Sequence, residues 1–322
     1  MRAIVQHRYG KPEDVLELRD DVDKPQVGEN QVLVRVSATS LNSGDWRRVY
    51  ASPAFIRLVA GYRRPKDRLL GGDAAGVVEK VGPGATELKV GDEVFGIRSG
   101  AFAEYVSGQH FVRKPANLSM EHAATVPIAG VTALQALREK GNVQPGERVL
   151  INGAGGGVGT FAVQIAKAFG AEVTAVTSSD KVDLVRSIGA DHVVDYSRTN
   201  FTKGGYRYDL IVDIGGNHSF RALHRCLAPN GRIVMVGAGK GMFGVFGRLI
   251  GGKVRKSVLK QPVVFFIAYG PYQDQLTTLK ELIEAGKVTP VIDRSYPLTD
   301  IAQAITYSGT EKTRGKVVIT ID

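Results

Sequence analysis

The spacing of hydrophobic and polar residues changes character about 120 residues into the chain. Before that point, short runs at 31–37, 75–81, 92–96 and 103–106 are rich in β-forming residues and are separated by Gly and Pro. Such runs are typical of strands. They predict an irregular, mainly antiparallel β domain over residues 1–123.

Beyond this domain, strand-like and helix-like segments alternate. The strand-like segments are 148–152, 172–177, 192–196, 209–214, 232–236 and 263–268. Helical spacing is found at 124–140, 157–169 and 181–188. Continuous apolar strands joined by helices predict a parallel sheet covered on both faces. We therefore expect an α/β protein with a doubly wound parallel sheet over 124–268, and a tail, 269–322, that returns to the first domain.

The segment RVLINGAGGGVG joins a strand to a helix through glycines. Counted from its first alanine, it has the spacing of the dinucleotide-binding fingerprint, with Ala in place of the first Gly. Small residues permit the tight turn, and the N–H groups that begin the helix can bind a pyrophosphate. The residues expected to do so are Ala154, Gly156, Gly157, Val158 and Gly159.

The end of the second strand indicates which dinucleotide is bound. NAD sites usually place an acidic residue there for the ribose 2′-hydroxyl. This chain has Thr177 and Ser178, followed by Asp180 and Lys181. Small hydroxyls and a lysine favour a 2′-phosphate, and we expect Asp180 to point away from it. The predicted cofactor is NADPH.

With these features the chain resembles the medium-chain dehydrogenase/reductase superfamily, in its zinc-free quinone oxidoreductase (zeta-crystallin-like) branch. The matching segments are LN (41–42), GGDAAGVV (71–78), VGDEVFG (90–96), AFAEYV (101–106), AGVTA (129–133) and GAGGGVG (153–159). The resemblance implies a GroES-like catalytic domain and a Rossmann domain.

The resemblance also implies site residues. Lys181 and Tyr196 match residues that hold the 2′-phosphate, and Arg314 resembles a third contact to it. Thr132 and Gly237 match positions at the nicotinamide end of the cofactor. Each has a structural alternative; for Tyr196 it is an aromatic residue at the sheet edge.

Zinc-containing members of the superfamily carry Cys where this chain has Asn42 and His where it has Gly72. Tetrahedral zinc needs three or four protein ligands close together. The six histidines are scattered and Cys226 is the single cysteine, so no metal is expected. Asn42 instead matches a polar residue near the nicotinamide ring; its alternative role is that of a turn former.

Composition excludes several classes of protein. Hydrophobic residues make up 43% and charged residues 23% of the chain, which is typical of a soluble globular protein. Without an apolar signal core or a long apolar run, we expect a cytoplasmic protein. The net charge is +10, but stacking aromatics do not alternate with the basic residues, so a nucleic-acid partner is not expected.

The predicted activity is hydride transfer from NADPH to a quinone or an α,β-unsaturated carbonyl acceptor. Such acceptors are already electrophilic and need no Lewis acid. Asn42 would donate a hydrogen bond to the developing oxyanion, and Tyr50 would orient the substrate or relay a proton, or simply pack. An enoyl-thioester reductase and a non-catalytic NADPH-binding protein remain alternatives.

Two surfaces suggest partners. The apolar last strand, 263–268, would leave unpaired backbone groups at a sheet edge, which predicts a homodimer through that edge. The segment 241–260 combines apolar and basic residues without an acid. It is expected to be a lid or a dimer contact; the alternative is a weak peripheral contact with an anionic membrane.

Overall fold

The computed structural model describes residues 1–54, 56–236 and 262–321. The chain forms two compact units, which we call unit 1 and unit 2. The segments of unit 1 are Met1–Val131, Gly270–Glu284 and Pro290–Asp322, and those of unit 2 are Thr132–Tyr269 and Ala285–Thr289. Among the described residues, no helix combines the length and the hydropathy needed to cross a bilayer.

Unit 2 is built on a parallel sheet, as expected from the continuous apolar strands. Its described strands are β8 (Arg148–Asn152), β9 (Glu172–Thr177), β10 (His192–Asp195), β11 (Tyr208–Asp213), β12 (Leu227–Val236) and β13 (Val263–Phe266). Their spatial order is β10-β9-β8-β11-β12-β13, with every pair parallel. This is the order of a doubly wound nucleotide-binding sheet. Successive strands are added on one side of β8 as far as β10, and then on its other side from β11 onward. The predicted fold of this region is confirmed.

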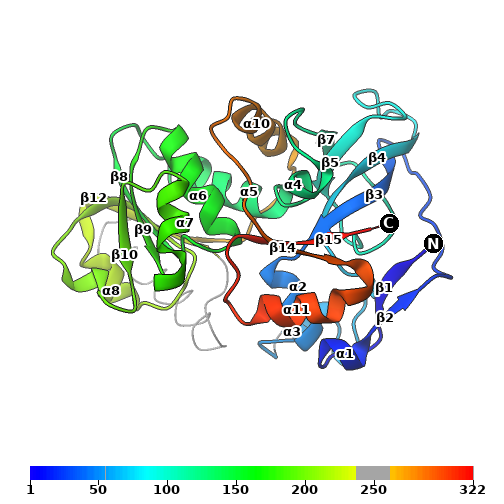
Figure 1. The fold of residues 1–322 in the computed structure, drawn as a ribbon, viewed down its shortest axis with the longest axis horizontal. Coiled ribbons are helices and arrows are strands. Elements are labelled where there is room, and N and C mark those ends of the chain that lie inside the picture. Colours follow the sequence, from blue (N-terminus) through cyan, green and yellow to red (C-terminus); the bar gives the residue numbers. More distant parts are fainter. Residues whose placement is uncertain (55, 237–261, 322) are drawn as a thin grey trace. The chain divides into compact units, whose positions relative to one another are not determined.

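Helices cover the strands of this sheet. They are α6 (Gly157–Ala168), α7 (Val182–Ser187), α8 (Phe220–His224), a π-helical segment (Gln135–Lys140) and 3₁₀ turns at Ser179–Lys181 and Phe201–Lys203. α6 packs on β8 and β9, α7 on β9 and β10, and α8 on β12 (Figure 1). All residues from Gly159 to Ala166 are buried, because α6 lies within the unit's core.

The helix predicted over 124–140 is broken into separate pieces. α4 (Met120–Ala124) ends before Pro127, and α5 (Pro127–Leu134) begins at that proline. Proline has no backbone N–H to donate, so it disrupts a helix interior but fits the first helical position. The π-helical segment then continues directly from α5.

Unit 1 contains a mainly antiparallel sheet, which also agrees with the prediction. Its described strands are β3 (Val32–Ser40), β4 (Asp73–Val81), β5 (Glu93–Ile97), β6 (Tyr105–Gly108), β7 (Phe111–Arg113), β14 (Ile292–Pro297) and β15 (Lys316–Thr320). The order is β14-β15-β3-β4-β5-β7, with β6 on β3, and the β14–β15 pair is parallel. β1 (Ala3–Gln6) and β2 (Leu16–Arg19) form a separate antiparallel pair. β15 pairs with β3, so the last strand of the chain completes a sheet that begins near its start.

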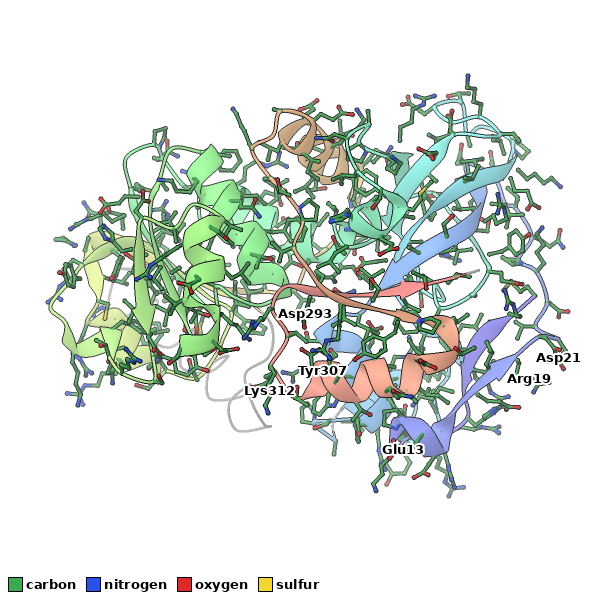
Figure 2. All side chains as sticks on the ribbon, in the orientation of Figure 1. Glu13, Arg19, Asp21, Asp293, Tyr307 and Lys312 are labelled. Carbon is green, nitrogen blue, oxygen red and sulfur yellow. The ribbon has the colours of Figure 1, made fainter. Side chains whose placement is uncertain are left out.

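The helices of unit 1 support this sheet. They include α1 (Pro12–Val15), α2 (Ser43–Tyr50), α3 (Ile56–Ala60), α10 (Gln273–Glu284), a 3₁₀ turn (Leu298–Asp300) and α11 (Ile301–Gly309). α11 packs against α1 and α2. The Tyr307 hydroxyl on α11 donates a hydrogen bond to Asp293 Oδ2 on β14 at 2.7 Å, and Figure 2 shows the two side chains facing each other. This contact fixes α11 to the edge of the sheet.

Candidate active site

The glycine-rich turn between β8 and α6 has the geometry of a phosphate-binding loop. Gly153 adopts φ +91°, a left-handed conformation that favours glycine. A β-carbon at Gly159 would lie 2.2 Å from the Gly153 carbonyl oxygen, so this position requires glycine. The first intrahelical bond recorded here runs from Thr160 N to Gly156 O at 3.0 Å. The N–H groups of Gly157, Val158 and Gly159 therefore point out of the helix N-terminus, where they can bind an anion.

Lys181 packs directly on this loop. A β-carbon at Gly155 would lie 2.7 Å from Lys181 Cδ and 2.7 Å from Thr177 Oγ1. The lysine side chain therefore crosses the loop over the bare Gly155 backbone. Lys181 is 8% exposed, and the 3₁₀ turn Ser179–Lys181 places it immediately after β9.

Two other predicted phosphate contacts lie at the carboxyl ends of adjacent strands. Ser178 follows β9, and its Oγ donates to Asp180 Oδ1 at 2.5 Å. The Asp180 carboxylate therefore faces this hydroxyl and does not point away from it, contrary to the expectation. Tyr196 follows β10, and its N–H donates to Thr177 O at 3.0 Å. The Tyr196 side chain is 52% exposed. The structure thus brings Ser178, Lys181 and Tyr196 to the carboxyl end of the sheet. This follows because β9 and β10 are parallel neighbours with Asp195 opposite Thr177.

A hydrogen-bonded network of polar residues lies at the carboxyl ends of β8 and β11, where the order of the strands reverses. The sequence analysis did not identify it. Asn152 Nδ2 donates to Asp213 Oδ1 at 2.7 Å and to Asn217 Oδ1 at 3.0 Å. Gly216 N also donates to Asp213 Oδ1, at 3.0 Å. Dinucleotides bind outside the carboxyl ends of the strands at such a reversal, so this network forms part of the cofactor side of unit 2.

Asn42, in unit 1, is held by a network of buried polar groups. It is half-buried and forms the N-cap of α2, with φ −122° and ψ 156°. Its Nδ2 donates to Asp73 Oδ2 at 2.8 Å, and its Oδ1 accepts from Lys316 Nζ at 2.7 Å. Asn42 therefore begins a helix, and its amide is fixed by charged partners.

One N–H of this amide remains available. The side-chain nitrogen of asparagine carries two hydrogens, and one of them is directed at Asp73. Within the residues that the structure describes, no acceptor for the second hydrogen is recorded. Asn42 is therefore equipped to donate one hydrogen bond to a ligand oxygen.

Asp45, three residues into α2, completes the helix start. Its Oδ2 accepts from the Asn42 backbone N–H at 2.8 Å, which is one half of a capping box. Burial raises the pKa of the Asp45 carboxyl to about 6, and nearby Asp73 adds to this rise, whereas the Asn42 N–H, Lys316 and Arg48 oppose it. The start of α2 therefore contains a carboxyl group that titrates well above its ordinary range.

The structure does not bring Tyr50 to Asn42. Asn42 precedes α2 and Tyr50 is its last residue, so they lie at opposite ends of the helix, about 12 Å apart along its axis. The Tyr50 ring lies 5.3 Å from the Trp46 ring and packs on the core of unit 1. This position favours the packing role that was the alternative for Tyr50.

The residues present do not fit a zinc ion. A β-carbon at Gly72 would lie 2.5 Å from Ile128 Cδ1, so a ligand side chain at this position would require Ile128 to move. The Lys316 ammonium group contacts Asn42 Oδ1, which places a cation beside the position that a cysteine ligand takes in the zinc-containing relatives. Among the described residues, no group of three or more His, Cys, Asp or Glu could hold a metal ion.

The other predicted residues lie in separate elements of the two units or outside the described part. Thr132 is 7% exposed and belongs to α5. Arg314 is exposed and lies in unit 1, two residues before β15. Gly237 and the segment 241–260 lie outside the residues that the structure describes.

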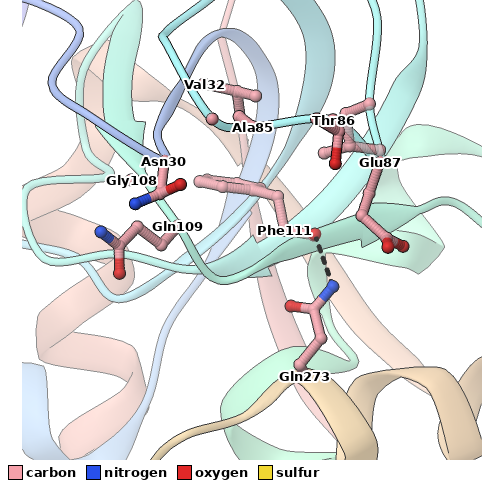
Figure 3. A pocket seen from close by; sticks show the side chains of 11 residues that line it. Asn30, Val32, Ala85, Thr86, Glu87, Gly108, Gln109, Phe111 and Gln273 are labelled. Carbon is pink, nitrogen blue, oxygen red and sulfur yellow. Dashed lines mark hydrogen bonds between the residues drawn. The ribbon is translucent and has the colours of Figure 1, made fainter.

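Unit 1 also has a surface pocket of about 380 Å³ (Figure 3). Its lining mixes polar side chains such as Asn30, Gln109 and Gln273 with apolar ones such as Leu88 and Phe111. Gln273 Nε2 donates to Phe111 O at 3.4 Å. The pocket lining contains no Lys or Arg to bind a phosphate and shares no residue with the Asn42 network. It is therefore not the candidate active site.

The sequence analysis missed Asp73, Lys316 and Ser40 as members of the site. Asp73 was part of a matching segment, but no role was assigned to it. One signal was present: a lysine begins the apolar run KVVIT, and an aspartate stands in the apolar run GGDAAGVV. Charged residues in buried strands need partners, so an aspartate and a lysine in two apolar runs indicate a buried ion pair.

Comparisons with known proteins agree with both units. The family model described as "Alcohol dehydrogenase GroES-like domain" matches residues 28–116, and the one described as "Zinc-binding dehydrogenase" matches residues 188–319. The mitochondrial NAD(P)H oxidoreductase RTN4IP1 of Mus musculus is 34% identical, over 100% of this chain and 89% of its own length. The 2-methylene-furan-3-one reductase of Solanum lycopersicum is 33% identical, over 99% of this chain and 79% of its own.

A solved structure matches the chain over its full length. The quinone oxidoreductase from Coxiella burnetii superposes with a TM-score of 0.87 at 29% sequence identity, covering 100% of this chain and 99% of that one. The match extends over both units.

Proposed function

From the fact that this chain belongs to the medium-chain dehydrogenase/reductase superfamily, in its zinc-free branch, we propose that it transfers a hydride from NADPH to a quinone or an α,β-unsaturated carbonyl compound. The observation that carries this proposal is the Asn42 amide. It offers one N–H to a ligand, and the two positions that carry Cys and His in zinc-containing members of the superfamily are Asn42 itself and Gly72 in this chain.

The chain's own groups have defined tasks in this reaction. Bound NADPH would supply the hydride. As an enone accepts a hydride at its β-carbon, the electrons of the C=C bond move toward the carbonyl and negative charge grows on its oxygen. The second N–H of Asn42 Nδ2 would donate to that oxygen, and a proton from water would complete the saturated ketone. The proposed catalytic role of Tyr50 is to orient the substrate or relay a proton, and packing is its alternative role.

NADPH is the proposed cofactor because of the residues at the ends of β9 and β10. Phosphate binding would use the N–H groups at the start of α6 for the pyrophosphate. The 2′-phosphate would be contacted by Ser178, Lys181 and Tyr196, because all three lie at the carboxyl end of the sheet. Arg314 is a further proposed phosphate contact, and Thr132 and Gly237 are proposed contacts at the nicotinamide end.

A test of the activity uses the purified full chain with NADPH and a panel of quinones, enones and crotonyl-CoA, following the loss of NADPH absorbance. We expect turnover of quinones or enones that exceeds turnover of crotonyl-CoA. A preference for crotonyl-CoA would support the enoyl-thioester reductase alternative. NADPH binding without turnover of any acceptor would support the non-catalytic alternative.

A test of cofactor choice uses Lys181→Ala, with Lys203→Ala as a control at an exposed lysine of the same unit. Removing a charge-assisted contact should weaken NADPH binding by roughly 1.5–3 kcal/mol and leave NADH binding nearly unchanged. Fluorescence titration measures both affinities. Equal losses for NADPH and NADH would contradict a phosphate-binding role of Lys181.

Tyr50→Phe tests the remaining catalytic assignment, because it keeps the ring on Trp46 and removes the hydroxyl. A proton relay through Tyr50 requires kcat to fall by about 10²-fold or more. An unchanged kcat would leave Tyr50 as a packing residue.

A homodimer through β13 is the proposed assembly. β13 is one of the two edge strands of the described unit 2 sheet, the other being β10, and Ile267, just beyond β13, is 69% exposed. An exposed apolar edge is a template for pairing with a second copy of the chain. Sedimentation at micromolar concentration tests this, and a monomer there would contradict it.

The segment 241–260 is proposed as a lid or a dimer contact, with a peripheral membrane contact as the alternative. Co-sedimentation with anionic vesicles at low salt tests the membrane alternative. The comparison is between wild type and a variant with Lys253, Arg255, Lys256 and Lys260 changed to Gln. Equal behaviour of the two proteins would exclude the membrane contact.

A further inference from the structure

Lys316 and Asp73 form a buried ion pair against the Asn42 amide. Lys316 is the first residue of β15 and Asp73 the first residue of β4. Lys316 Nζ lies 3.2 Å from Asp73 Oδ2, and the two side chains are 2% and 0% exposed. A charge pair so deeply removed from water is weak evidence of stabilisation, because its desolvation offsets the attraction between the charges. Its position against the Asn42 amide indicates a role other than stabilisation.

The lysine has no unused donor. Its ammonium group has three N–H bonds. They are accounted for by Leu41 O at 2.9 Å, Asn42 Oδ1 at 2.7 Å and Asp73 Oδ2 at 3.2 Å. Lys316 is thus fixed in place and cannot itself act on a substrate. Its effect must pass through one of these three neighbours.

The aspartate is equally well satisfied. Oδ2 accepts from Ser40 Oγ at 2.6 Å and from Asn42 Nδ2 at 2.8 Å, in addition to Lys316. Oδ1 accepts from Ile128 N at 2.8 Å. Like Lys316, Asp73 is fully paired and out of contact with solvent. Asn42, which is half-buried, is the member of this network with a remaining donor.

The two charges set the orientation of the Asn42 amide. A cation contacts its oxygen and an anion contacts its nitrogen, so rotating the amide by half a turn would place its NH₂ against the ammonium and its oxygen against the carboxylate. Both contacts would then be repulsive. In addition, a hydrogen bond accepted by an amide oxygen polarises the amide and strengthens its N–H donors. The pair therefore fixes the direction of the second N–H and makes it a better donor.

We propose that Lys316 and Asp73 are positioning residues that act through Asn42, holding its amide so that one polarised N–H faces the reacting carbonyl oxygen. This inference rests on the proposed function, in which Asn42 stabilises the oxyanion. It adds that a buried ammonium group supplies, through an amide, part of the positive polarisation that a metal ion would otherwise provide. A purely structural role would instead be to join β15 and β4 to the start of α2.

A double-mutant cycle separates these roles. The first change is Lys316→Met combined with Asp73→Asn, which removes both charges and keeps an acceptor for the Ile128 N–H. The second change is Asn42→Ala. We expect the first change to lower kcat for an enone by about 10- to 100-fold in the wild-type background, and by less than about 3-fold once Asn42 is Ala. The same factor in both backgrounds would overturn the inference.

Two controls remove stability as an explanation. Lys114→Met changes another lysine of unit 1, with an 8% exposed side chain and an ion pair to Glu93, and should leave kcat unchanged. NADPH affinity, measured by fluorescence titration, should be the same in every variant. A general loss of folding would instead lower the affinity, or lower kcat for Lys114→Met as well. If the Lys316→Met/Asp73→Asn variant does not fold, Lys316→Gln combined with Asp73→Asn, which also removes both charges but keeps a polar group at position 316, is tested in the same cycle.

Comparing acceptors gives a further readout. Reduction of an enone needs more stabilisation of the developing oxyanion than reduction of a strongly oxidising quinone. The first change should therefore lower enone turnover by at least 10-fold more than quinone turnover. Equal losses with both acceptors would indicate a structural role and overturn the inference.

The crystal structure of the Lys316→Met/Asp73→Asn variant separates failure of this inference from failure of the proposed function. We expect the Asn42 amide to rotate or to become disordered once its charged partners are removed. An unchanged, well-ordered amide overturns the inference, whatever the wild-type activity. If wild type reduces no acceptor and the amide nevertheless rotates, the positioning of Asn42 is supported and the proposed function is wrong.

Discussion

The side chain of Lys181 lies across Gly155, at a distance where a β-carbon on the glycine would be 2.7 Å from Lys181 Cδ. A residue at the end of β9 is thus positioned by a residue in the loop after β8. The phosphate loop and the residue proposed to select the cofactor are therefore mechanically coupled.

Gly155→Ala should disturb this coupling. The added methyl group would force Lys181 away from the loop, and such overpacking typically costs about 1–3 kcal/mol. We expect NADPH affinity to fall by about 10-fold and NADH affinity to fall less. Gly44→Ala, at a position with no heavy atom near the added carbon, is the control. Equal losses of NADPH and NADH affinity would show that the loop, rather than the lysine, was disturbed.

Asp45→Asn should change how stability depends on pH. Because the folded-state pKa of Asp45 is raised to about 6 from an ordinary 3.8, the folded chain binds this proton more tightly than the unfolded chain does. Wild type should therefore lose stability relative to the variant as pH rises from about 4 to 6, by roughly 2–3 kcal/mol in total. Below about pH 4 the difference should be independent of pH.

Fluorescence measures this change directly, because Trp46 is the single tryptophan of the chain and is adjacent to Asp45. Urea unfolding at pH 4, 5, 6 and 7 gives the difference between variant and wild type. A difference that is constant over this range would contradict the raised pKa.

Arg232→Met should destabilise unit 2. Arg232 Nη1 and Nη2 bind Glu147 Oε1 and Oε2 at 2.8 and 2.6 Å, and the guanidinium also donates to the Asn142 and Asp209 carbonyls. Partial burial raises the pKa of Glu147, but Arg232 and the Gln144 N–H together outweigh this effect and leave the pKa below its ordinary value. Leaving the glutamate unpaired should cost about 3 kcal/mol, at the low end for buried pairs because this pair is partly exposed.

The matched control for Arg232 is Arg186→Met, which breaks the exposed pair with Asp183 and should cost less than about 0.5 kcal/mol. Hydrogen exchange of the β12 amides measures both effects. The contribution of the Glu147 pair should be lost as pH falls below about 4.5, where the unfolded chain begins to take up the proton. Equal protection in the two variants would contradict the prediction.

Gly309→Ala should displace Trp46. A β-carbon at Gly309, in α11, would lie 2.1 Å from Trp46 Nε1. Because Trp46 belongs to α2, whose N-cap is Asn42, the collision should move the helix as well as the ring. We expect a loss of roughly 1–3 kcal/mol and a shift in tryptophan emission. Thr306→Ala, at an exposed position of the same helix, should change neither property.

Much of the fold follows from local patterns that can be read directly along this sequence. The alternation of apolar strands and helices predicted a parallel sheet, and the glycine-rich turn predicted a phosphate loop at a helix start. These predictions succeeded because a strand buried on both faces needs a continuous apolar run, as in Val149, Leu150 and Ile151, which are all fully buried. The break at Pro127 was missed because the apolar spacing of helices continues through it.

The phosphate loop itself was assigned from the sequence because its residues are neighbours in the chain. Turn geometry and helix N-terminal donors arise within a few residues, so local spacing is sufficient to predict them. The coupling of Lys181 to Gly155 was not predicted, because it depends on how closely the residues after β9 approach the loop after β8.

The Asn42 network was decided by the tertiary structure alone. Lys316 and Asp73 are 243 positions apart, and they meet only because β15 pairs with β3 and β3 pairs with β4. A charged residue at the start of a strand appears in the sequence as an ordinary boundary residue. Its burial, and the partner that makes burial tolerable, depend on sheet order, which apolar spacing does not encode. The sequence by itself therefore determined the folds of the two units and the nucleotide loop. Strand pairing determined which charges hold the amide of Asn42.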